Sequence, residues 1–328
     1  MGRSRGVNSE RRQEIQSVSV AFGRRDSTPL LTQNIIGGQT VTPSESFHRH
    51  LQAALVHQRS GRWQAAEEIY DALLAKAPND AELIHLIGVL LHQRGLDADA
   101  LDWLDRATNL LPTLATFHFN RGTVLAALKR WNEAIAAFRH VTHLDPRFPG
   151  AHFNLGVALH QRGRLDEAMT AYRDALAIAP DPDPANNLGL VLKGIGRSKD
   201  AVAAFRQALI FNPTHADAAL NLASTLREMG DHDKALTQYL QALSFHPKKA
   251  EVHFQIGLIH QQAQRIDQAE QHYALAVAEN GHPESANNLA LLLERKNRLA
   301  EAEALYRQAI QAKPDFLDPA NNLGNLLQ

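Results

Sequence analysis

Side-chain amides recur along the 328-residue chain at intervals close to 34 residues. A carboxamide offers both a hydrogen-bond donor and an acceptor, so it can pair with a peptide unit whatever side chain that unit carries. Asn also bonds frequently to groups of its own helix pair, which leaves a packing interpretation open beside the binding one. Only Leu86 interrupts the series. We name it the amide row, and it consists of Gln52, Asn120, Asn154, Asn187, Asn221, Gln255, Asn288 and Asn322.

The residue that precedes each amide changes in character along the chain. Late in the sequence it is often a second amide, as at Asn186, Asn287 and Asn321. Elsewhere it is an aromatic ring, as at Phe119, Phe153 and Phe254. If the amides share one face, that face has an aromatic half and an amide-rich half.

The 17 histidines raise the question of a metal site. His85 and His92 are seven residues apart, as are His253 and His260. On a helix this spacing separates two side chains by about 10 Å, at roughly 1.5 Å per residue, whereas the nitrogen ligands of one zinc ion lie about 2 Å from it. The chain also contains no Cys, which excludes thiolate ligands and nucleophiles. The sequence therefore predicts neither a metal nor a cofactor.

No catalytic motif and no phosphate- or dinucleotide-binding loop occurs in the sequence. The balance of 34 basic and 35 acidic residues gives no sign of a nucleic-acid partner. The longest apolar run, around residues 83–91, is too short to span a bilayer. We expect a non-enzymatic, cytoplasmic protein without a nucleic-acid or membrane partner.

The stretch Ala151–Pro180 indicates which elements position the amide row. Two segments with the helical spacing of apolar residues flank a short polar turn that contains Gly163. Glycine at this place favours a left-handed helix end, while Asp166 and Glu167 suit the first turn of a second helix. A proline then stops that helix. The stretch predicts a helix-turn-helix hairpin.

Gly156 and Ala168 are small residues twelve apart, where the paired helices come closest, and Tyr172 one turn later fills the neighbouring gap. The pattern recurs with a period of 34 residues, except for two steps of 33. Such a period predicts eight complete hairpin repeats and the first helix of a ninth. The repeats start at Phe47, Ala81, Ala115, Pro149, Pro182, Ala216, Ala250, Pro283 and Leu317.

This period, with its small, aromatic and Pro positions, resembles the tetratricopeptide repeat over residues 47–328. The resemblance implies an all-α fold, a right-handed superhelix (α-solenoid) of helix-turn-helix repeats with the first helices along its concave surface. We place the array at residues 45–328. Residues 1–44 are rich in Ser, Thr, Gln and Gly and contain six Arg, so we interpret them as a disordered basic tail.

The strings AHFNLGVALHQRGRLDEA, ANNLGLVLKGIG and PANNLGNLL also resemble the repeats that precede the catalytic domain of O-linked N-acetylglucosamine transferases, including the SPINDLY-like bacterial ones. In those enzymes an asparagine ladder holds the backbone of an extended peptide. A clamp for a C-terminal carboxylate is not expected, because no Lys or Arg occupies the fifth repeat position. The resemblance implies peptide binding by Asn120, Asn154, Asn187, Asn221, Gln255, Asn288 and Asn322, beside Phe119, Phe153 and Phe254.

The sequence thus predicts a non-catalytic scaffold that binds proteins or extended peptides in its groove. Two alternatives stay open: the substrate-recognition arm of a protein O-linked N-acetylglucosamine transferase that lacks its catalytic domain, and a self-assembling structural array. The ninth repeat is incomplete, so Leu323, Leu326 and Leu327 are expected to be exposed. A homo-oligomer formed through this uncapped end is a further option.

Overall fold

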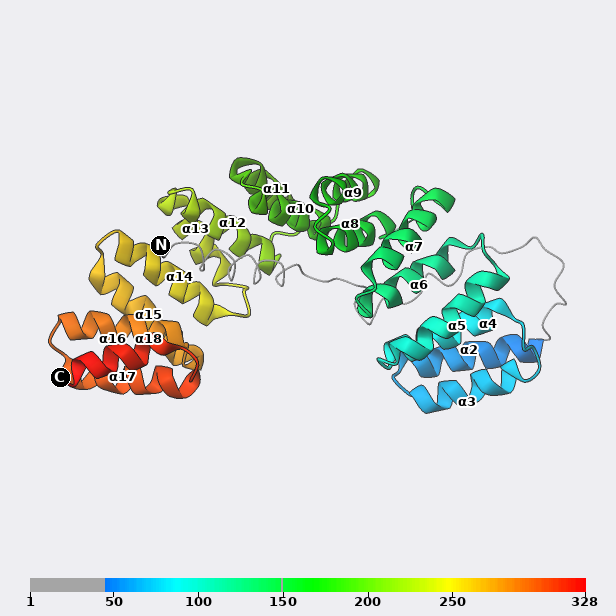
Figure 1. Cartoon of the computed structure of the whole chain (residues 1–328), viewed down its shortest axis with the longest axis horizontal. Helices are drawn as coiled ribbons and strands as arrows, with labels where there is room; N and C mark the ends of the chain where they lie inside the picture. The colour runs from blue at the N-terminus through cyan, green and yellow to red at the C-terminus, as the bar shows by residue number, and fades with distance from the viewer. Residues whose placement is uncertain (1–44, 149) are drawn as a thin grey trace. The chain divides into compact units, whose positions relative to one another are not determined.

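The computed structural model describes residues 45–148 and 150–328. Within these residues the chain forms seventeen α-helices and no strand (Figure 1). The expected all-α solenoid of paired helices is confirmed. The tail predicted for residues 1–44 lies outside the described residues. None of the described helices is long and apolar enough to cross a membrane.

The chain divides into two compact units, Met1–Pro180 and Asp181–Gln328. The described part of the first unit consists of four helix pairs: α2 (Glu45–Arg59) with α3 (Trp63–Leu74), α4 (Ala81–Gln93) with α5 (Asp97–Leu110), α6 (Ala115–Ala127) with α7 (Trp131–Leu144), and α8 (Ala151–Gln161) with α9 (Leu165–Ile178).

The second unit continues the same pattern with four pairs and a last first helix. These are α10 (Pro182–Gly194) with α11 (Ser198–Phe211), α12 (Ala216–Glu228) with α13 (His232–Ala242), α14 (Lys249–Gln262) with α15 (Ile266–Asn280), α16 (Pro283–Arg295) with α17 (Leu299–Ala312), and α18 (Leu317–Leu326).

The turn between the two helices of a hairpin has one residue in the left-handed region. Gly163 occupies this place between α8 and α9 with a φ of +73°. Lys129, Gln264 and Asn297 adopt the same conformation in their own hairpins, with φ of 59°, 58° and 59°. L-residues rarely adopt this region because the Cβ atom crowds the backbone. The hairpin geometry therefore overrides a local preference at these three turns.

The small residues lie at the closest approach of the paired helices, as the sequence predicts. A Cβ atom added to Gly156 of α8 would lie 2.6 Å from Cε1 of Tyr172 on α9. Such a distance is below van der Waals contact, so only glycine fits beneath the ring. The same arrangement occurs at Gly122 with Phe138 (2.7 Å), Gly189 with Phe205 (2.5 Å) and Gly257 with Tyr273 (2.5 Å).

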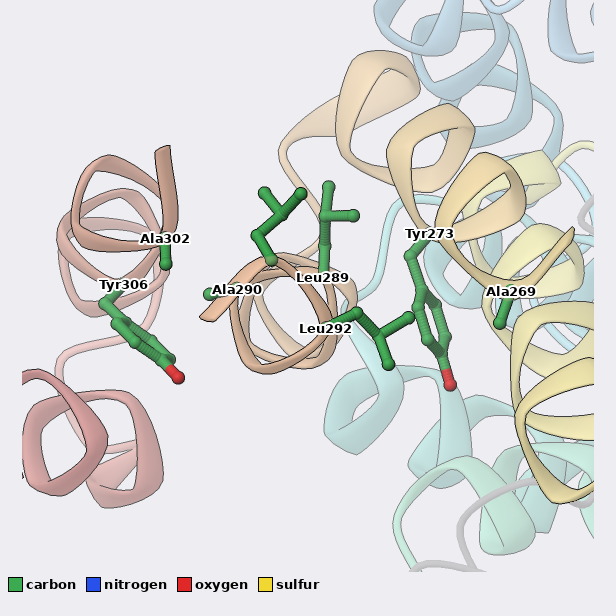
Figure 2. Packing of buried hydrophobic residues seen from close by; sticks show 8 residues of the cluster. Ala269, Tyr273, Leu289, Ala290, Leu292, Ala302 and Tyr306 are labelled. Carbon is green, nitrogen blue, oxygen red and sulfur yellow. The ribbon is translucent and has the colours of Figure 1, made fainter. Parts of the chain in front are cut away.

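Within each unit, a first helix also packs against the second helix of the hairpin before it. In Figure 2, Leu292 of α16 faces Tyr273 of α15, while Ala290 on the other side of α16 faces Ala302 and Tyr306 of α17. All five of these residues are buried. The core of each unit is therefore a row of small interlocking clusters rather than one central core, as is typical of repeat proteins.

The end of α18 differs from the prediction made for it. Leu323 and Leu326 pack, partly buried, against the cluster around Tyr306. Leu327 is 61% exposed. The expectation that all three leucines are exposed is therefore wrong for two of them, because a first helix covers the apolar face of the preceding second helix even without its own partner.

Candidate functional site

The amide row lies on the first helices, with one amide on each of α6, α8, α10, α12, α14, α16 and α18. Gln52, on α2, is exposed. In the first unit α6 contacts both α4 and α8, and in the second unit α10 contacts α12 and α16 contacts α18. We name the surface formed by the first helices of each unit the first-helix face. A side chain on this face can reach the neighbouring repeat.

Asn120 is bonded to the repeat that precedes it. Its Nδ2 donates a hydrogen bond to Nε2 of His85, 2.7 Å away on α4. Since an amide nitrogen can only donate, His85 is neutral with Nε2 unprotonated. His85 is fully buried and its ring stacks on Phe117, with centroids 4.3 Å apart. Burial lowers the pKa of His85 to about 3.

Two further amides of the row repeat this arrangement with an asparagine as partner. Asn221 donates to Oδ1 of Asn186, and Asn322 donates to Oδ1 of Asn287, both at 2.9 Å. In all three pairs the acceptor is the fifth residue of the preceding repeat, 35 positions earlier in the chain. We name Asn120, Asn221 and Asn322 the bridged amides.

The bridge leaves half of each amide available. A carboxamide has two N–H groups and one carbonyl oxygen, and the bridge uses a single N–H. Within the described residues, no group donates to the Oδ1 of any bridged amide, and all three side chains are partly exposed. The bridge therefore fixes the orientation of the amide and leaves its acceptor unused.

Asn154 and Asn187 differ from the bridged amides. Asn154 is 3% exposed and Asn187 is fully buried. Oδ1 of Asn154, and both Nδ2 and Oδ1 of Asn187, have no hydrogen-bond partner in the described residues. The fifth residues of the repeats before them are Phe119 and Phe153, which offer no hydrogen bond. These two amides of the row are therefore packed inside the array rather than presented on its surface.

Gln255 and Asn288 are partly exposed but are not bridged. Nε2 of Gln255 donates to Oε1 of Glu251 on its own helix at 2.8 Å. Nδ2 of Asn288 donates to the hydroxyl oxygen of Tyr273 over a long 3.5 Å. These two side chains are thus held by weaker or more local contacts than the bridged amides.

The three phenylalanines beside the row contact the large aromatic residue of their own hairpin. Phe119 lies 5.8 Å from Phe138, and Phe153 and Phe254 each lie 6.1 Å from the tyrosine of their hairpin, measured between ring centroids. Phe153 is buried, whereas Phe119 and Phe254 are partly exposed. Only these last two rings can contribute to a binding surface.

Several of the other histidines lie close to a carbonyl oxygen or to one another. Nε2 of His118 and of His152 each contact the carbonyl oxygen of the proline that ends the preceding repeat, at 2.8 and 3.0 Å. On α14 and α15, Nδ1 of His253 and Nδ1 of His272 are 3.1 Å apart, and His260 stacks on His272. Burial and these two neighbours lower the pKa of His272 to about 4. Across the described chain, no group of three or more side chains is arranged to hold a metal ion.

Glu251, His282 and Ser285 form a chain of hydrogen bonds that resembles a catalytic triad in outline. Oε2 of Glu251 is 3.3 Å from Nε2 of His282, and Nδ1 of His282 is 3.1 Å from Oγ of Ser285. However, Ser285 is fully buried, so no substrate reaches its hydroxyl. Nδ1 of His282 also accepts the backbone N–H of Ser285 at 3.2 Å. The three residues form the N-terminal cap of α16 and its tie to the preceding repeat.

Comparison with known families identifies the array. A model of the tetratricopeptide repeat matches residues 51–115, 119–182 and 254–315, which together exceed half of the chain. The chain belongs to the tetratricopeptide repeat family. Further models of this repeat match residues 184–215, 204–237 and 223–264. Tetratricopeptide coverage is thus nearly continuous from residue 51 to residue 315.

Solved tetratricopeptide structures resemble this chain at low sequence identity. The solved segment of MamA from Desulfovibrio magneticus RS-1, residue 41 to the end, is 22% identical, with 50% of this chain and 94% of that segment covered and a TM-score of 0.48. YrrB, described as a TPR protein with an unusual peptide-binding site, is 19% identical over 67% of this chain and 96% of YrrB, with a TM-score of 0.44. PilF of Pseudomonas aeruginosa is 20% identical over 62% of this chain and 92% of PilF, with a TM-score of 0.53. Among curated proteins, none matches the chain significantly.

These likenesses concern the fold. Tetratricopeptide arrays stack their hairpins into extended surfaces on which other proteins bind. The fold is typical of non-catalytic interaction scaffolds, and this chain shares it.

Proposed function

We propose that this tetratricopeptide protein binds extended polypeptide segments on its first-helix face, through the partly exposed amides of the row. The observation that carries the proposal is the bridge from each of Asn120, Asn221 and Asn322 to the preceding repeat. It turns a flexible side chain into a fixed acceptor for a peptide N–H.

Fixing the amide in advance favours binding. An immobilised polar side chain costs roughly 0.5–1.5 kcal/mol of conformational entropy at an interface, and the bridge has already removed part of that freedom. A hydrogen bond to a peptide unit contributes roughly 0.5–1.5 kcal/mol. A row of such acceptors would hold the backbone of a ligand and leave its side chains to other contacts.

The remaining members of the row have different roles in this proposal. Gln255 and Asn288 are partly exposed and would add contacts in the second unit, with Phe254 beside them, although Oε1 of Gln255 is buried and would not act as an acceptor. Asn154 and Asn187 are buried and would act in packing. A role as the recognition arm of an O-linked N-acetylglucosamine transferase would use the same amides, and it rests on the sequence resemblance alone.

The proposal is tested with the full chain and short synthetic peptides of unrelated sequence. A triple variant, Asn221→Ala, Gln255→Ala and Asn288→Ala, removes three partly exposed amides from the second unit. Its matched control, Gln207→Ala, Gln268→Ala and Gln271→Ala, removes three exposed amides from the second helices α11 and α15. Circular dichroism verifies that both variants keep their helices.

Fluorescence anisotropy should show that the row variant binds every peptide more weakly, by about 0.5–1.5 kcal/mol for each lost hydrogen bond. The control variant should bind like the unmodified chain. The loss should be similar for peptides of unrelated sequence, because the contacts are to the peptide backbone. Equal affinity of the two variants for all peptides would leave the amide row with a packing role only.

A further inference from the structure

A second surface of the molecule has the properties of a docking groove. It runs between the second helices α11 and α13, with α12 as its floor, and encloses about 440 Å³. Its lining is mainly apolar: Leu209, Ile210, Leu222, Leu226 and Phe245. Ile210 is 77% exposed, the largest exposed fraction among the large apolar residues of the described chain. An aliphatic side chain left in water at the mouth of an apolar groove is a typical feature of a docking surface.

The equivalent place between α7 and α9 in the first unit carries polar contacts instead. Nη2 of Arg139 on α7 binds Oε2 of Glu167 on α9 at 2.6 Å. Nδ1 of His152 lies 3.8 Å from Oδ2 of Asp174 on α9. An ion pair between successive second helices and a polar contact within the α8–α9 hairpin thus lie over this place.

The groove between α11 and α13 is open because the residues at the same repeat positions differ. Arg206 and Lys234 occupy the positions of Arg139 and Glu167, so both are basic and no ion pair forms between them. Ala219 replaces His152, and Gln241 replaces Asp174. On the wall of the groove, Leu209 replaces Thr142 and Ile210 replaces His143.

The two cations make the rim of the groove positive. Arg206 forms no ion pair within the described residues, and Nζ of Lys234 binds Oδ2 of Asp231 at 2.5 Å. The hydrogen bond from Lys234, with a smaller effect of Arg206, holds the pKa of Asp231 below its usual value. One carboxylate faces two cations here, so the rim complements an anionic group on a ligand.

The walls and floor of the groove select a helical ligand. All three elements are α-helices, whose backbone N–H and C=O groups are bonded within each helix. An extended peptide would need backbone partners that the groove lacks, apart from the side chains of Thr237, Gln238 and Gln241. A helix satisfies its own backbone and presents an apolar stripe to the groove.

We propose that the groove between α11 and α13 docks an amphipathic helix of a partner protein, with apolar side chains against Leu209, Ile210 and Phe245 and a carboxylate facing Arg206 and Lys234. From Lys234 to Phe245 the groove has room for about three turns of such a helix, at 1.5 Å per residue. This surface is distinct from the first-helix face, so one chain can hold two ligands of different shape.

The test uses two synthetic helical peptides with the same leucine stripe. One carries glutamates beside the stripe and the other carries lysines. Lys234→Glu places a carboxylate opposite Arg206, as Glu167 stands opposite Arg139, and should close the groove. Ile210→Ser removes an anchor at an exposed position where folding is not at risk. Lys199→Glu makes the same charge change on an exposed part of α11 outside the groove and serves as the control.

The unmodified chain should bind the glutamate peptide roughly tenfold or more tighter than the lysine peptide. Lys234→Glu and Ile210→Ser should each weaken that binding by a similar factor, whereas Lys199→Glu should leave it nearly unchanged. Hydrogen exchange should show protection of α11 and α13 by the peptide. The proposal is overturned by equal binding of the two peptides, by protection confined to the first helices, or by light scattering that shows a second copy of the chain in the groove.

Discussion

The junction from α4 to α6 and the junction from α6 to α8 have the same packing but different hydrogen bonding. Both place a glycine of the first helix under an aromatic ring, Gly122 under Phe138 and Gly156 under Tyr172. Across the first junction Asn120 is bonded to His85, whereas across the second Oδ1 of Asn154 is buried without a partner. The repeat thus fixes the helix packing, while the residue at the fifth position decides whether the following amide can be bridged.

The difference arises from one side chain. The fifth residue is a histidine before Asn120 and a phenylalanine before Asn154. Histidine accepts the amide hydrogen and leaves Asn120 partly exposed, with its carbonyl oxygen unused. Phenylalanine offers no acceptor, and Asn154 is buried. A polar residue at the fifth position of the preceding repeat therefore fixes the amide that follows it, but it is not the sole cause of exposure, since Asn288 follows Phe254 and is partly exposed.

The largest expected effect on stability comes from disrupting the packing that both junctions share, a glycine beneath an aromatic ring. Gly156→Leu should destabilise the hairpin by about 3 kcal/mol, because even a Cβ atom would lie 2.6 Å from the ring of Tyr172. Hydrogen exchange measured by mass spectrometry should increase in α8 and α9 and in the adjacent α7. Helices α2 to α5 should keep their protection, since a repeat contacts only its neighbours.

A uniform loss of protection throughout the first unit would contradict this. Gly163→Ala is a useful companion variant, because it strains the left-handed turn of the same hairpin without a steric clash, Gly163 having open space around it. It should destabilise the hairpin by only about 1 kcal/mol.

The second prediction concerns a variant in which the junction from α4 to α6 receives the phenylalanine that the junction from α6 to α8 has at the same position. His85→Phe removes the acceptor of Asn120 and should cost about 1 kcal/mol at neutral pH, because Asn120 can still bond to water. At acidic pH the variant should become the more stable of the two proteins. The pKa of His85 is lowered to about 3 in the fold, so the unfolded chain binds its proton first as the pH falls below about 6.5.

The contribution of neutral His85 to stability is therefore complete above about pH 6.5 and is lost as the pH falls towards 3. At pH 5 the unmodified protein should have lost about 2 kcal/mol through this residue, while the variant has no such loss. Urea denaturation followed between pH 5 and 7 should show the two stability curves cross. Parallel curves would mean that His85 stays neutral in both states or is less buried than its surroundings imply.

The sequence was sufficient to predict the hairpins, the glycine turns and the small-against-large packing, because each depends on residues within one repeat. It was not sufficient to predict the bridges. Whether Asn120 reaches His85 depends on the register of two first helices, and that register is set by the second helix packed between them. The sequence contained one signal, a polar residue at the fifth position 35 places before an amide, as in the pairs of Asn186 with Asn221 and Asn287 with Asn322.

The smallest expected effect on stability comes from introducing a hydrogen-bond bridge at the junction from α6 to α8, which lacks one. Phe119→His introduces a hydrogen-bonding ring at the position that His85 occupies one repeat earlier. Part of the packing of Phe119 against Phe138 and Phe148, at 5.8 and 5.0 Å, would be kept because an aromatic ring remains. The new bond to Asn154 and the lost apolar contact should nearly cancel, so the stability of the single variant should change by less than about 1 kcal/mol.

A double-mutant cycle isolates the bond from this small net change. The cycle combines Phe119→His with Asn154→Ala, and a parallel cycle combines His85→Phe with Asn120→Ala. The first should yield a coupling of about 0.5–1 kcal/mol between the introduced histidine and Asn154, similar to the coupling between His85 and Asn120 in the second. In the unmodified protein Phe119 can only pack beside Asn154, so the coupling must come from the new hydrogen bond. If the first cycle gives zero coupling while the second does not, the fifth-position residue alone does not decide the role of the amide, and the helix register of the two junctions must differ as well.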